Sequence, residues 1–293
     1  MKLLITGASG LYGSKLAQLA TSRQHKGYSA DILGQAAYGE PVQIDITDKA
    51  QIEATFQKLN PDVVIHAAVL TDVDKCELNR ELAWKINVEG TVNVAQAAKD
   101  CGAFLLNIST DYVFDGEKGN YTETDLPSPV SFYGYTKLKS EEAVKKILTK
   151  YCIARTSVIY GSTPAAGKIN FALWLLNKLT NKEQTSVFTD QWNSPTLNTS
   201  LAEMTLEVAE RKIAGTFHLS GATRISRYDF ATLFAKIFEL DGSLLVPILS
   251  KDLKFPAKRP KDSSLNTAKA QQTLKNKPLP IEKALTQLKT ELT

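Results

Sequence analysis

The stretch LLITGASGLYG, residues 3–13, joins a short apolar run to three glycines spaced three residues apart. Gly7, Gly10 and Gly13 follow an expected strand and open an expected helix. In a βαβ unit, the first glycine allows a tight turn, the second close approach of a pyrophosphate, and the third packing of helix on strand. Such a triplet also fits an ordinary strand-to-helix turn, so its meaning depends on the sequence around it.

Short apolar runs recur along the chain, and stretches with helical spacing separate them. The runs are continuous rather than alternating, which is typical of strands buried on both faces, and they lie at 2–6, 61–68, 104–110 and 152–160. The helical stretches lie at 13–23, 50–59, 81–102 and 133–148. This alternation predicts an α/β fold with a doubly wound parallel sheet.

The alternation is lost after residue 160, which predicts a second unit. We expect residues 1–160 to form a dinucleotide-binding domain. Residues 161–293 are expected to form mainly a smaller, less regular substrate-binding domain, with some segments returning to the first domain. Two ends are marked locally, because Asp48 is expected to cap the helix at 50–59 and Gly102 to end the helix at 81–102.

Composition excludes several classes of protein. The chain has 293 residues, 43% of them hydrophobic, but no apolar run long enough for a membrane-spanning helix and no signal-peptide pattern at its start. Its three cysteines are far apart and form no CxxC pair, which fits a reducing cytoplasm and predicts no metal site. No basic, aromatic-interleaved module indicates nucleic acid. We therefore expect a cytoplasmic protein without membrane or nucleic-acid partners.

The segment YGYTK places Tyr133 and Lys137 four residues apart, on one face of a helix. A phenol with a pKa of about 10 exchanges its proton poorly at neutral pH unless a nearby cation helps, and Lys137 is expected to lower that pKa. Such a pair can pass a proton to a substrate oxygen. Ser109 and Thr110 end the run at 104–110, where ligands bind in parallel sheets. A bare YxxxK also occurs by chance on amphipathic helices, so this context is needed.

Asp31 lies near the end of the expected second strand. An acidic residue there can bind the hydroxyls of an adenosine ribose, and it can equally be an ordinary loop carboxylate. The choice between NAD and NADP therefore stays open.

The glycine triplet, the HAA segment after a buried strand, the ST pair and YxxxK together resemble the extended short-chain dehydrogenase/reductase family. More narrowly, the chain resembles the dTDP-4-dehydrorhamnose reductases, in order and over nearly its whole length. The segments that carry this resemblance are PDVVIHAAVLTDVDKCE, STDYVFDG, YGYTKLKSEE, RTSVIYG, DQWNSPT and RPKDSSL.

The resemblance implies reduction, by NADPH or NADH, of the C4 ketone of a deoxyhexulose carried on a nucleotide diphosphate. The implied catalytic residues are Thr110, Tyr133 and Lys137. Besides Tyr133 and Lys137, the expected cofactor contacts are Gly7, Gly10, Leu11, Tyr12, Gly13, Asp31, Asp45, Ile46, Ala67, Ala68 and Ser109. The expected substrate contacts are Asp111, Val158, Asn170, Phe171 and Arg259, whose planar guanidinium suits a pyrophosphate.

Departures from the family pattern keep other functions open. Val158 stands where some relatives carry a tryptophan against the sugar, so the sugar stays open. Lys15 stands near a carboxylate that bridges some bacterial dimers through magnesium, so we expect no metal-bridged dimer, while another homodimer stays open. One alternative is an epimerase or dehydratase, but Tyr112 replaces the glutamate that dehydratases carry after the Thr-Asp pair. The other is a regulatory subunit similar to that of methionine adenosyltransferase, against which Thr110, Tyr133 and Lys137 are all present.

Overall fold

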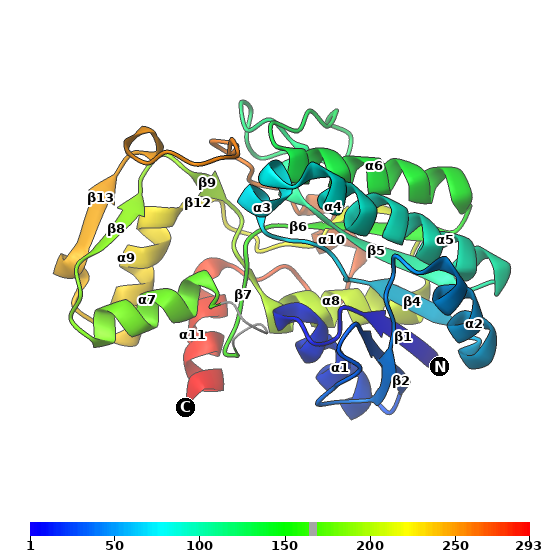
Figure 1. The fold of residues 1–293 in the computed structure, drawn as a ribbon. Coiled ribbons are helices and arrows are strands. Elements are labelled where there is room, and N and C mark those ends of the chain that lie inside the picture. The colour runs from blue at the N-terminus through cyan, green and yellow to red at the C-terminus, as the bar shows by residue number, and fades with distance from the viewer. Residues whose placement is uncertain (164–168) are drawn as a thin grey trace.

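The computed structural model describes residues 1–163 and 169–293 and is built around a sheet of seven parallel strands. The strand order is β11-β6-β5-β4-β1-β2-β3, with parallel pairing throughout (Figure 1). The chain moves outward from β1 to β3 and then restarts at β4 on the other side of β1, so the sheet is doubly wound, as predicted. The strands are β1 (Lys2–Thr6), β2 (Lys26–Asp31), β3 (Glu40–Gln43), β4 (Val63–His66), β5 (Phe104–Thr110), β6 (Tyr151–Thr156) and β11 (Gly215–His218).

Two layers of helices cover this sheet. Helices α1 and α8 pack on one face, and α2, α5 and α6 pack on the other. The remaining helices belong to the connections or to a second, smaller lobe. The bounds are α1 (Leu11–Ser22), α2 (Lys49–Leu59), α3 (Val73–Leu78), α4 (Arg80–Trp84), α5 (Gly90–Asp100), α6 (Phe132–Ile147), α7 (Phe171–Thr180), α8 (Asn198–Arg211), α9 (Arg227–Phe238), α10 (Ala268–Thr273) and α11 (Ile281–Leu292).

The continuous apolar runs of the sequence are explained by burial of the strands on both faces. Successive side chains of a strand point to opposite faces. In β1, Leu3 and Ile5 therefore contact the core beneath α1 and α8, whereas Leu4 contacts the core on the side of α2, α5 and α6. All three are fully buried, and each such side chain contributes about 1.5–3 kcal/mol relative to exposure.

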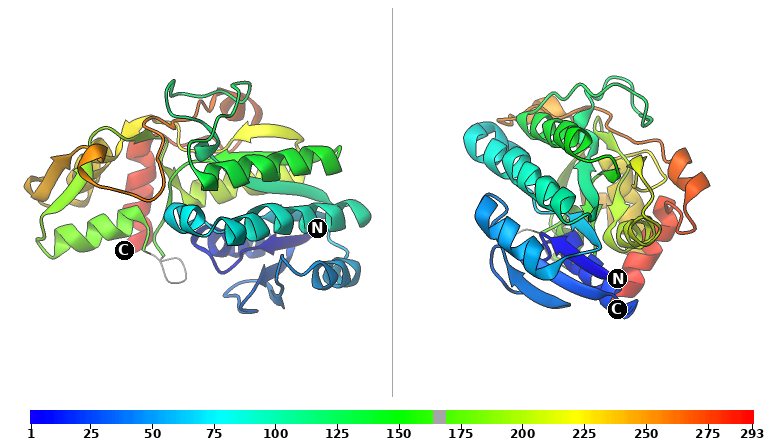
Figure 2. Two further views of the ribbon diagram at one scale, coloured as in Figure 1. Left: turned by 45° about the horizontal axis from the view of Figure 1, so that its top comes forward. Right: turned by 90° about the vertical axis from the view of Figure 1, so that its right-hand side faces the viewer.

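The smaller lobe lies beyond one end of the sheet and has its own apolar core (left view of Figure 2). Helices α7, α9 and α11 enclose this core together with two parallel strands, β8 (Thr185–Phe188) and β13 (Leu245–Ile248). Phe230 and Phe234 of α9 lie at its centre and are almost fully buried. Four two-residue strands lie between the lobe and the sheet: β7 (Ile159–Tyr160), β9 (Trp192–Asn193), β10 (Thr196–Leu197) and β12 (Ile225–Ser226).

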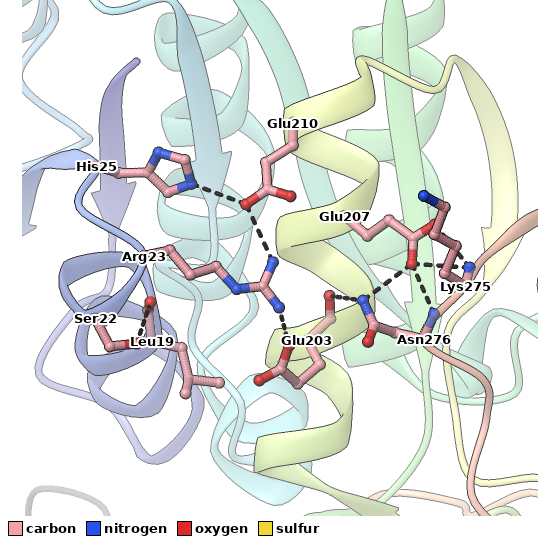
Figure 3. Close-up of polar contacts among 9 residues, drawn as sticks. All are labelled: Leu19, Ser22, Arg23, His25, Glu203, Glu207, Glu210, Lys275 and Asn276. Atoms are coloured by element: carbon pink, nitrogen blue, oxygen red, sulfur yellow. Dashed lines mark hydrogen bonds and ion pairs between the residues drawn. The ribbon is translucent and has the colours of Figure 1, made fainter.

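The C-terminal half of the chain also contributes to the main sheet. Strand β11 pairs with β6 and forms the edge of the sheet, and α8 packs against α1. At the C-terminal end of α1, Arg23 contacts Glu203 and Glu210 of α8 (Figure 3). One turn away, Glu207 accepts hydrogen bonds from the backbone N–H groups of Lys275 (2.7 Å) and Asn276 (2.7 Å). These contacts join segments that are far apart in the sequence.

The expected element ends at Asp48 and Gly102 are confirmed. The Asp48 side chain accepts from the N–H of Gln51 at 3.0 Å, and Gly102 has a φ of +69°, which suits a residue just past a helix.

Two expected elements are interrupted in the structure. The run at 152–160 is not one strand, because β6 ends at Thr156 and Val158 has a φ of +36° before β7 begins. A β-branched residue rarely adopts this conformation, which costs about 1–3 kcal/mol. The helix at 81–102 is divided by a π-helical turn at Lys85–Glu89. In that turn Asn87 accepts from the N–H of Leu70 and donates to the hydroxyl of Thr136, so cross-element bonds accompany the interruption.

Candidate active site

A cavity of about 890 Å³ lies at the carboxyl ends of β1, β2, β4 and β5, and the start of α9 in the smaller lobe closes its far side. This is the edge of the sheet where ligands bind in doubly wound folds. Every site residue expected from the sequence lines this cavity except Arg259. The structure thus brings together residues that are up to about 160 positions apart in the chain.

The glycine loop forms the floor of the cavity beside α1. Gly7 has a φ of +72°, and a Cβ there would lie 2.7 Å from the amide nitrogen of Ala68. A Cβ on Gly13 would collide with the carbonyl of Gly7, so α1 packs too closely on β1 for any side chain. Gly10 precedes α1, and its own Cβ would meet only the Gly7 carbonyl, at 3.3 Å. The N-terminus of α1 therefore opens into the cavity as a site suited to an anion.

Two carboxylates lie at the end of the cavity formed by β2 and the chain after β3. Asp31 is the last residue of β2, and its side chain accepts from the N–H of Ser9 at 3.2 Å. Asp45 accepts from the N–H and the hydroxyl of Thr47 at 2.8 and 2.9 Å, which fixes the turn before α2. Ile46 lies between Asp45 and Thr47 and also lines the cavity. Asp31 thus belongs to the cavity wall and is held by the glycine loop itself.

His66 is a residue of this region that the sequence analysis did not select. It ends β4 and is almost fully buried, with Nδ1 2.7 Å from the hydroxyl of Thr6 and Nε2 3.1 Å from that of Thr91. Burial, with a smaller contribution from Lys137, lowers the pKa of His66 to about 3, so the ring is neutral. Thr6 also accepts from the N–H of Ala68, so this neutral histidine supports the turn that carries Ala67 and Ala68.

Helix α6 carries the tyrosine and lysine expected to be catalytic. The hydroxyl of Ser131 caps its start by accepting from the N–H of Gly134 at 3.2 Å, and Tyr133 and Lys137 then line the cavity one turn apart. Burial strongly raises the pKa of Tyr133, and the contact with the Thr110 hydroxyl offsets only part of this effect. The sequence analysis expected a lowered pKa for this tyrosine, whereas the pKa is raised, because burial outweighs the other contributions. The phenol keeps its proton at neutral pH.

Lys137 is buried near the ion pair that Glu141 forms with Arg155. Burial lowers its pKa to about 8, and the charge of Glu141, one turn further along α6, opposes this change. Glu141 accepts two hydrogen bonds from Arg155, at 2.9 and 2.7 Å, and one from the hydroxyl of Ser109, at 2.6 Å. Ser109 therefore points toward α6 and is oriented by Glu141. This network fixes α6 against β5 and β6 beneath the expected catalytic residues.

Asp111 follows Thr110 and is buried, with only 2% of its surface exposed. Its carboxylate accepts from the hydroxyls of Thr110 (3.0 Å), Ser157 (2.7 Å) and Ser263 (2.5 Å). Burial raises the pKa of Asp111, although these three hydrogen bonds oppose the rise. Asp111 therefore orients the Thr110 hydroxyl and joins the end of β5 to two distant segments, besides lining the cavity.

The smaller lobe supplies the other end of the cavity. Val158, Asn170 and Phe171 lie there, and the side chain of Asn170 caps α7 by accepting from the N–H of Leu173 at 3.2 Å. Arg259 does not line the cavity, because both of its terminal nitrogens are bound to Asp74 at 2.6 Å.

Tyr112 and Arg227 are lining residues that the sequence analysis did not place in the substrate site. Tyr112 could have been found from its position beside Thr110 and Asp111. No local signal marks Arg227, which reaches the cavity only because α9 begins there.

In the part of the chain that the structure describes, no three His, Cys, Asp or Glu side chains gather as a set of metal ligands. Within the same residues, no helix has the length and apolar character needed to cross a membrane.

The chain is similar to known proteins over nearly its whole length. The model of the RmlD substrate binding domain family matches residues 1–293. A dTDP-4-dehydrorhamnose reductase of Escherichia coli K12 is 33% identical, over 93% of this chain and 91% of that protein. The beta subunit of methionine adenosyltransferase 2 from Rattus norvegicus is 32% identical, over 92% of this chain and 81% of that protein.

Among solved structures, a dTDP-4-dehydrorhamnose reductase from Bacillus anthracis, in complex with NADP, superposes with a TM-score of 0.90. It is 31% identical to this chain, and the match covers 99% of this chain and all of that one. The match of the family model over the full length, together with these relatives, shows that the chain belongs to the RmlD substrate binding domain family.

Proposed function

We propose that this protein is an oxidoreductase that uses NADPH or NADH to reduce the C4 ketone of a deoxyhexulose bound to a nucleotide diphosphate. The proposed reaction converts dTDP-4-dehydro-L-rhamnose to dTDP-L-rhamnose, as the names of the bacterial relatives suggest. The observation that carries the proposal is that the glycine loop and the residues Thr110, Tyr133 and Lys137 line one cavity.

The residues around the glycine loop fit a nicotinamide dinucleotide. Gly10 and Gly13 have no side chain. A Cβ on Gly10 would fill the approach to the loop, and a Cβ on Gly13 would push α1 away from β1. The free N–H groups at the start of α1 would hold the pyrophosphate, and Asp31 would bind the adenosine ribose. When bound, the reduced nicotinamide would supply the hydride for the ketone carbon.

The side chains near the ketone supply the proton and the charge. Tyr133, whose pKa is raised by burial, would donate its proton to the ketone oxygen. The cation of Lys137, one turn away, would stabilise the phenolate that remains. Thr110, whose hydroxyl is oriented by Asp111, would hold the carbonyl oxygen.

The similarity to the beta subunit of a methionine adenosyltransferase keeps a non-catalytic role as a second candidate. In that case the cavity would bind a dinucleotide without turnover. Thr110, Tyr133 and Lys137 together in the cavity favour the reductase, because cofactor binding alone does not require a proton donor there.

The location and the assembly of the protein stay predictions. Cys76, Cys101 and Cys152 are free thiols, which supports the expected cytoplasmic location. The sequence predicts no metal-bridged dimer and leaves another homodimer open, and light scattering of the purified chain would measure its mass in solution.

The test is oxidation of NADH and of NADPH by the purified protein with dTDP-4-dehydrorhamnose generated in situ. Turnover with either cofactor would support the proposal and measure the cofactor preference. Tight binding of a cofactor without turnover of this keto-sugar would contradict it and favour the non-catalytic role.

A further inference from the structure

The cavity holds two cationic side chains among its described lining residues, Lys137 and Arg227. Lys137 lies on α6, one turn from Tyr133, at the expected reaction centre. Arg227 is the first residue of α9 and lies at the opposite end, in the smaller lobe. The expected substrate carries a ketone at one end and a diphosphate at the other, so these two cations mark different parts of it.

Arg227 is held in place by neutral groups. Its Nε donates to the side-chain oxygen of Gln191 at 3.1 Å, and its backbone N–H donates to the Gln191 carbonyl at 3.0 Å. Its guanidinium lies 5.2 Å from the centre of the Phe171 ring. Within residues 1–163 and 169–293, no carboxylate forms an ion pair with it. Its positive charge is therefore not neutralised by that part of the chain.

The neighbouring arginines are already neutralised. Arg259 is bound through both terminal nitrogens to Asp74, and one of them also donates to the Ala257 carbonyl at 2.7 Å. Arg224 is bound to Asp262 at 2.7 Å. A diphosphate would have to displace a carboxylate to bind either of them, whereas Arg227 can offer a guanidinium edge directly.

The spacing of the cavity wall also fits. The rings of Tyr133 and Tyr112 are 6.0 Å apart, centre to centre. Burial raises the pKa of the Tyr112 phenol, and the charges of Arg227 and Arg259 oppose this rise; Arg227 alone of the two also forms a hydrogen bond with it. Tyr112 thus interacts with both the proton donor and Arg227, and the sugar of the substrate would lie along this wall.

We propose that Arg227, and not Arg259, binds the diphosphate of the substrate and makes the cavity selective for nucleotide-linked sugars. This inference rests on the proposed function and goes further by assigning the residue that selects the substrate class. The anion at Arg227 would have two sources, the substrate's diphosphate or the phosphates of the cofactor, and we assign the substrate's.

The experiment measures binding of thymidine diphosphate and of thymidine to the full-length protein by calorimetry, with cofactor present. Arg227→Gln is expected to weaken binding of thymidine diphosphate about 30-fold, because charged hydrogen bonds are lost, and to leave thymidine unchanged. Arg227→Lys should restore part of the affinity, since it keeps the charge without the planar fork. In turnover, KM should rise with kcat nearly unchanged.

Arg224→Gln is the matched control, because it removes an arginine three residues away that lies outside the cavity. It should bind thymidine diphosphate like the wild type. The melting temperature reports whether Arg227→Gln still folds, and if it does not, Arg227→Met, which keeps the apolar stem and removes the charge, replaces it.

Equal binding of thymidine diphosphate by wild type and Arg227→Gln would overturn the proposal, even if the enzyme reduces the keto-sugar. A loss confined to cofactor affinity would also overturn it. If the wild type binds thymidine diphosphate through Arg227 but does not turn over the keto-sugar, the proposed reaction fails and the binding site stands.

Discussion

Tyr133 is the candidate proton donor, and its burial changes the pKa of its phenol. Burial raises the pKa of the phenol well above its ordinary value of about 10. A protonated phenol can donate to the oxygen of a ketone that is being reduced, whereas oxidation of an alcohol would need it as a base. The buried phenol can therefore serve as the proton donor of a reduction.

Removal of the phenol oxygen should abolish most of the activity. Tyr133→Phe is expected to lower kcat about 10²–10⁴-fold, which is the usual contribution of a positioned proton donor. Dinucleotide affinity, measured by fluorescence titration, should change little. Tyr135→Phe is the control, because Tyr135 lies on the same helix but is 40% exposed and does not line the cavity. Equal rates for wild type and Tyr133→Phe would remove the assigned role.

Lys137 should set the alkaline limit of activity. Its pKa is lowered to about 8, so the cation is present below this pH and is lost as pH rises through it. We expect kcat/KM of the wild type, which reports the free enzyme, to fall above pH 8. Lys137→Arg should lose this fall, because an arginine stays charged, although its maximal rate should be about tenfold lower. The same fall in Lys137→Arg would assign it to another group.

At the scale of elements, two glycines at the junction of β1 and α1 have different roles. Gly13 lets the helix approach the strand, since a Cβ would collide with the Gly7 carbonyl, and so it serves packing. A Cβ on Gly10 would have only that carbonyl within 4 Å, at 3.3 Å, and so the missing side chain of Gly10 serves the cavity. One loop thus combines a stability requirement with a binding requirement.

Gly13→Ala should affect stability, and Gly10→Ala should affect binding of the cofactor. Gly13→Ala is expected to lower the free energy of unfolding by about 1–3 kcal/mol through overpacking, measured by urea denaturation. Gly10→Ala should unfold nearly like the wild type but bind NADPH about tenfold more weakly, a loss of about 1.4 kcal/mol. Unchanged NADPH affinity in Gly10→Ala would show that no pyrophosphate approaches this loop.

At the scale of the whole molecule, the C-terminal half is joined to the sheet at several distant points. Ser263 donates to Asp111 beside the cavity, and Arg259 is paired with Asp74 of α3. On the opposite face, Glu207 of α8 accepts from the backbone of Lys275 and Asn276. The C-terminal half of the chain is therefore fixed against the sheet by polar contacts as well as by apolar cores.

Glu207 should matter for stability and not for binding. Glu207→Ala leaves the N–H groups of residues 275 and 276 without their acceptor, so we expect the free energy of unfolding to fall by about 3 kcal/mol. Cofactor affinity should be unchanged, since Glu207 does not line the cavity. Glu53→Ala, which removes an exposed partner of Lys49, should change stability by less than about 0.5 kcal/mol. A loss as small in Glu207→Ala would refute the assigned anchoring role.

The contribution of Glu207 should also depend on pH. Burial favours the neutral acid, but hydrogen bonds from Asn276, Lys275 and Arg211 outweigh it and lower the pKa of Glu207. A carboxyl with a lowered pKa stabilises the fold above the ordinary value of about 4.3, and this stabilisation is lost as pH falls. The stability difference between wild type and Glu207→Ala should therefore be full at neutral pH and shrink in acid. A difference that grows in acid would contradict this sign.

The sequence by itself determined the features that depend on local order. Continuous apolar runs predicted buried parallel strands, because both faces of each strand must be covered. The spacing of Tyr133 and Lys137 placed both on one helix face, since neighbours four apart share a face. The motifs carried the family resemblance, and the residues expected to contact the cofactor do line one cavity.

Only the tertiary structure decided the features that depend on packing between distant segments. The kink at Val158 divides an apolar run that reads as one strand, because β7 pairs with β10 rather than continuing β6. Arg259 forms an ion pair with Asp74, 185 positions away in sequence. Arg227 lines the cavity from a helix that no motif marks. An arginine's availability depends on which carboxylate packs beside it, and burial raises the pKa of Tyr133; neither is encoded in the local pattern of residues.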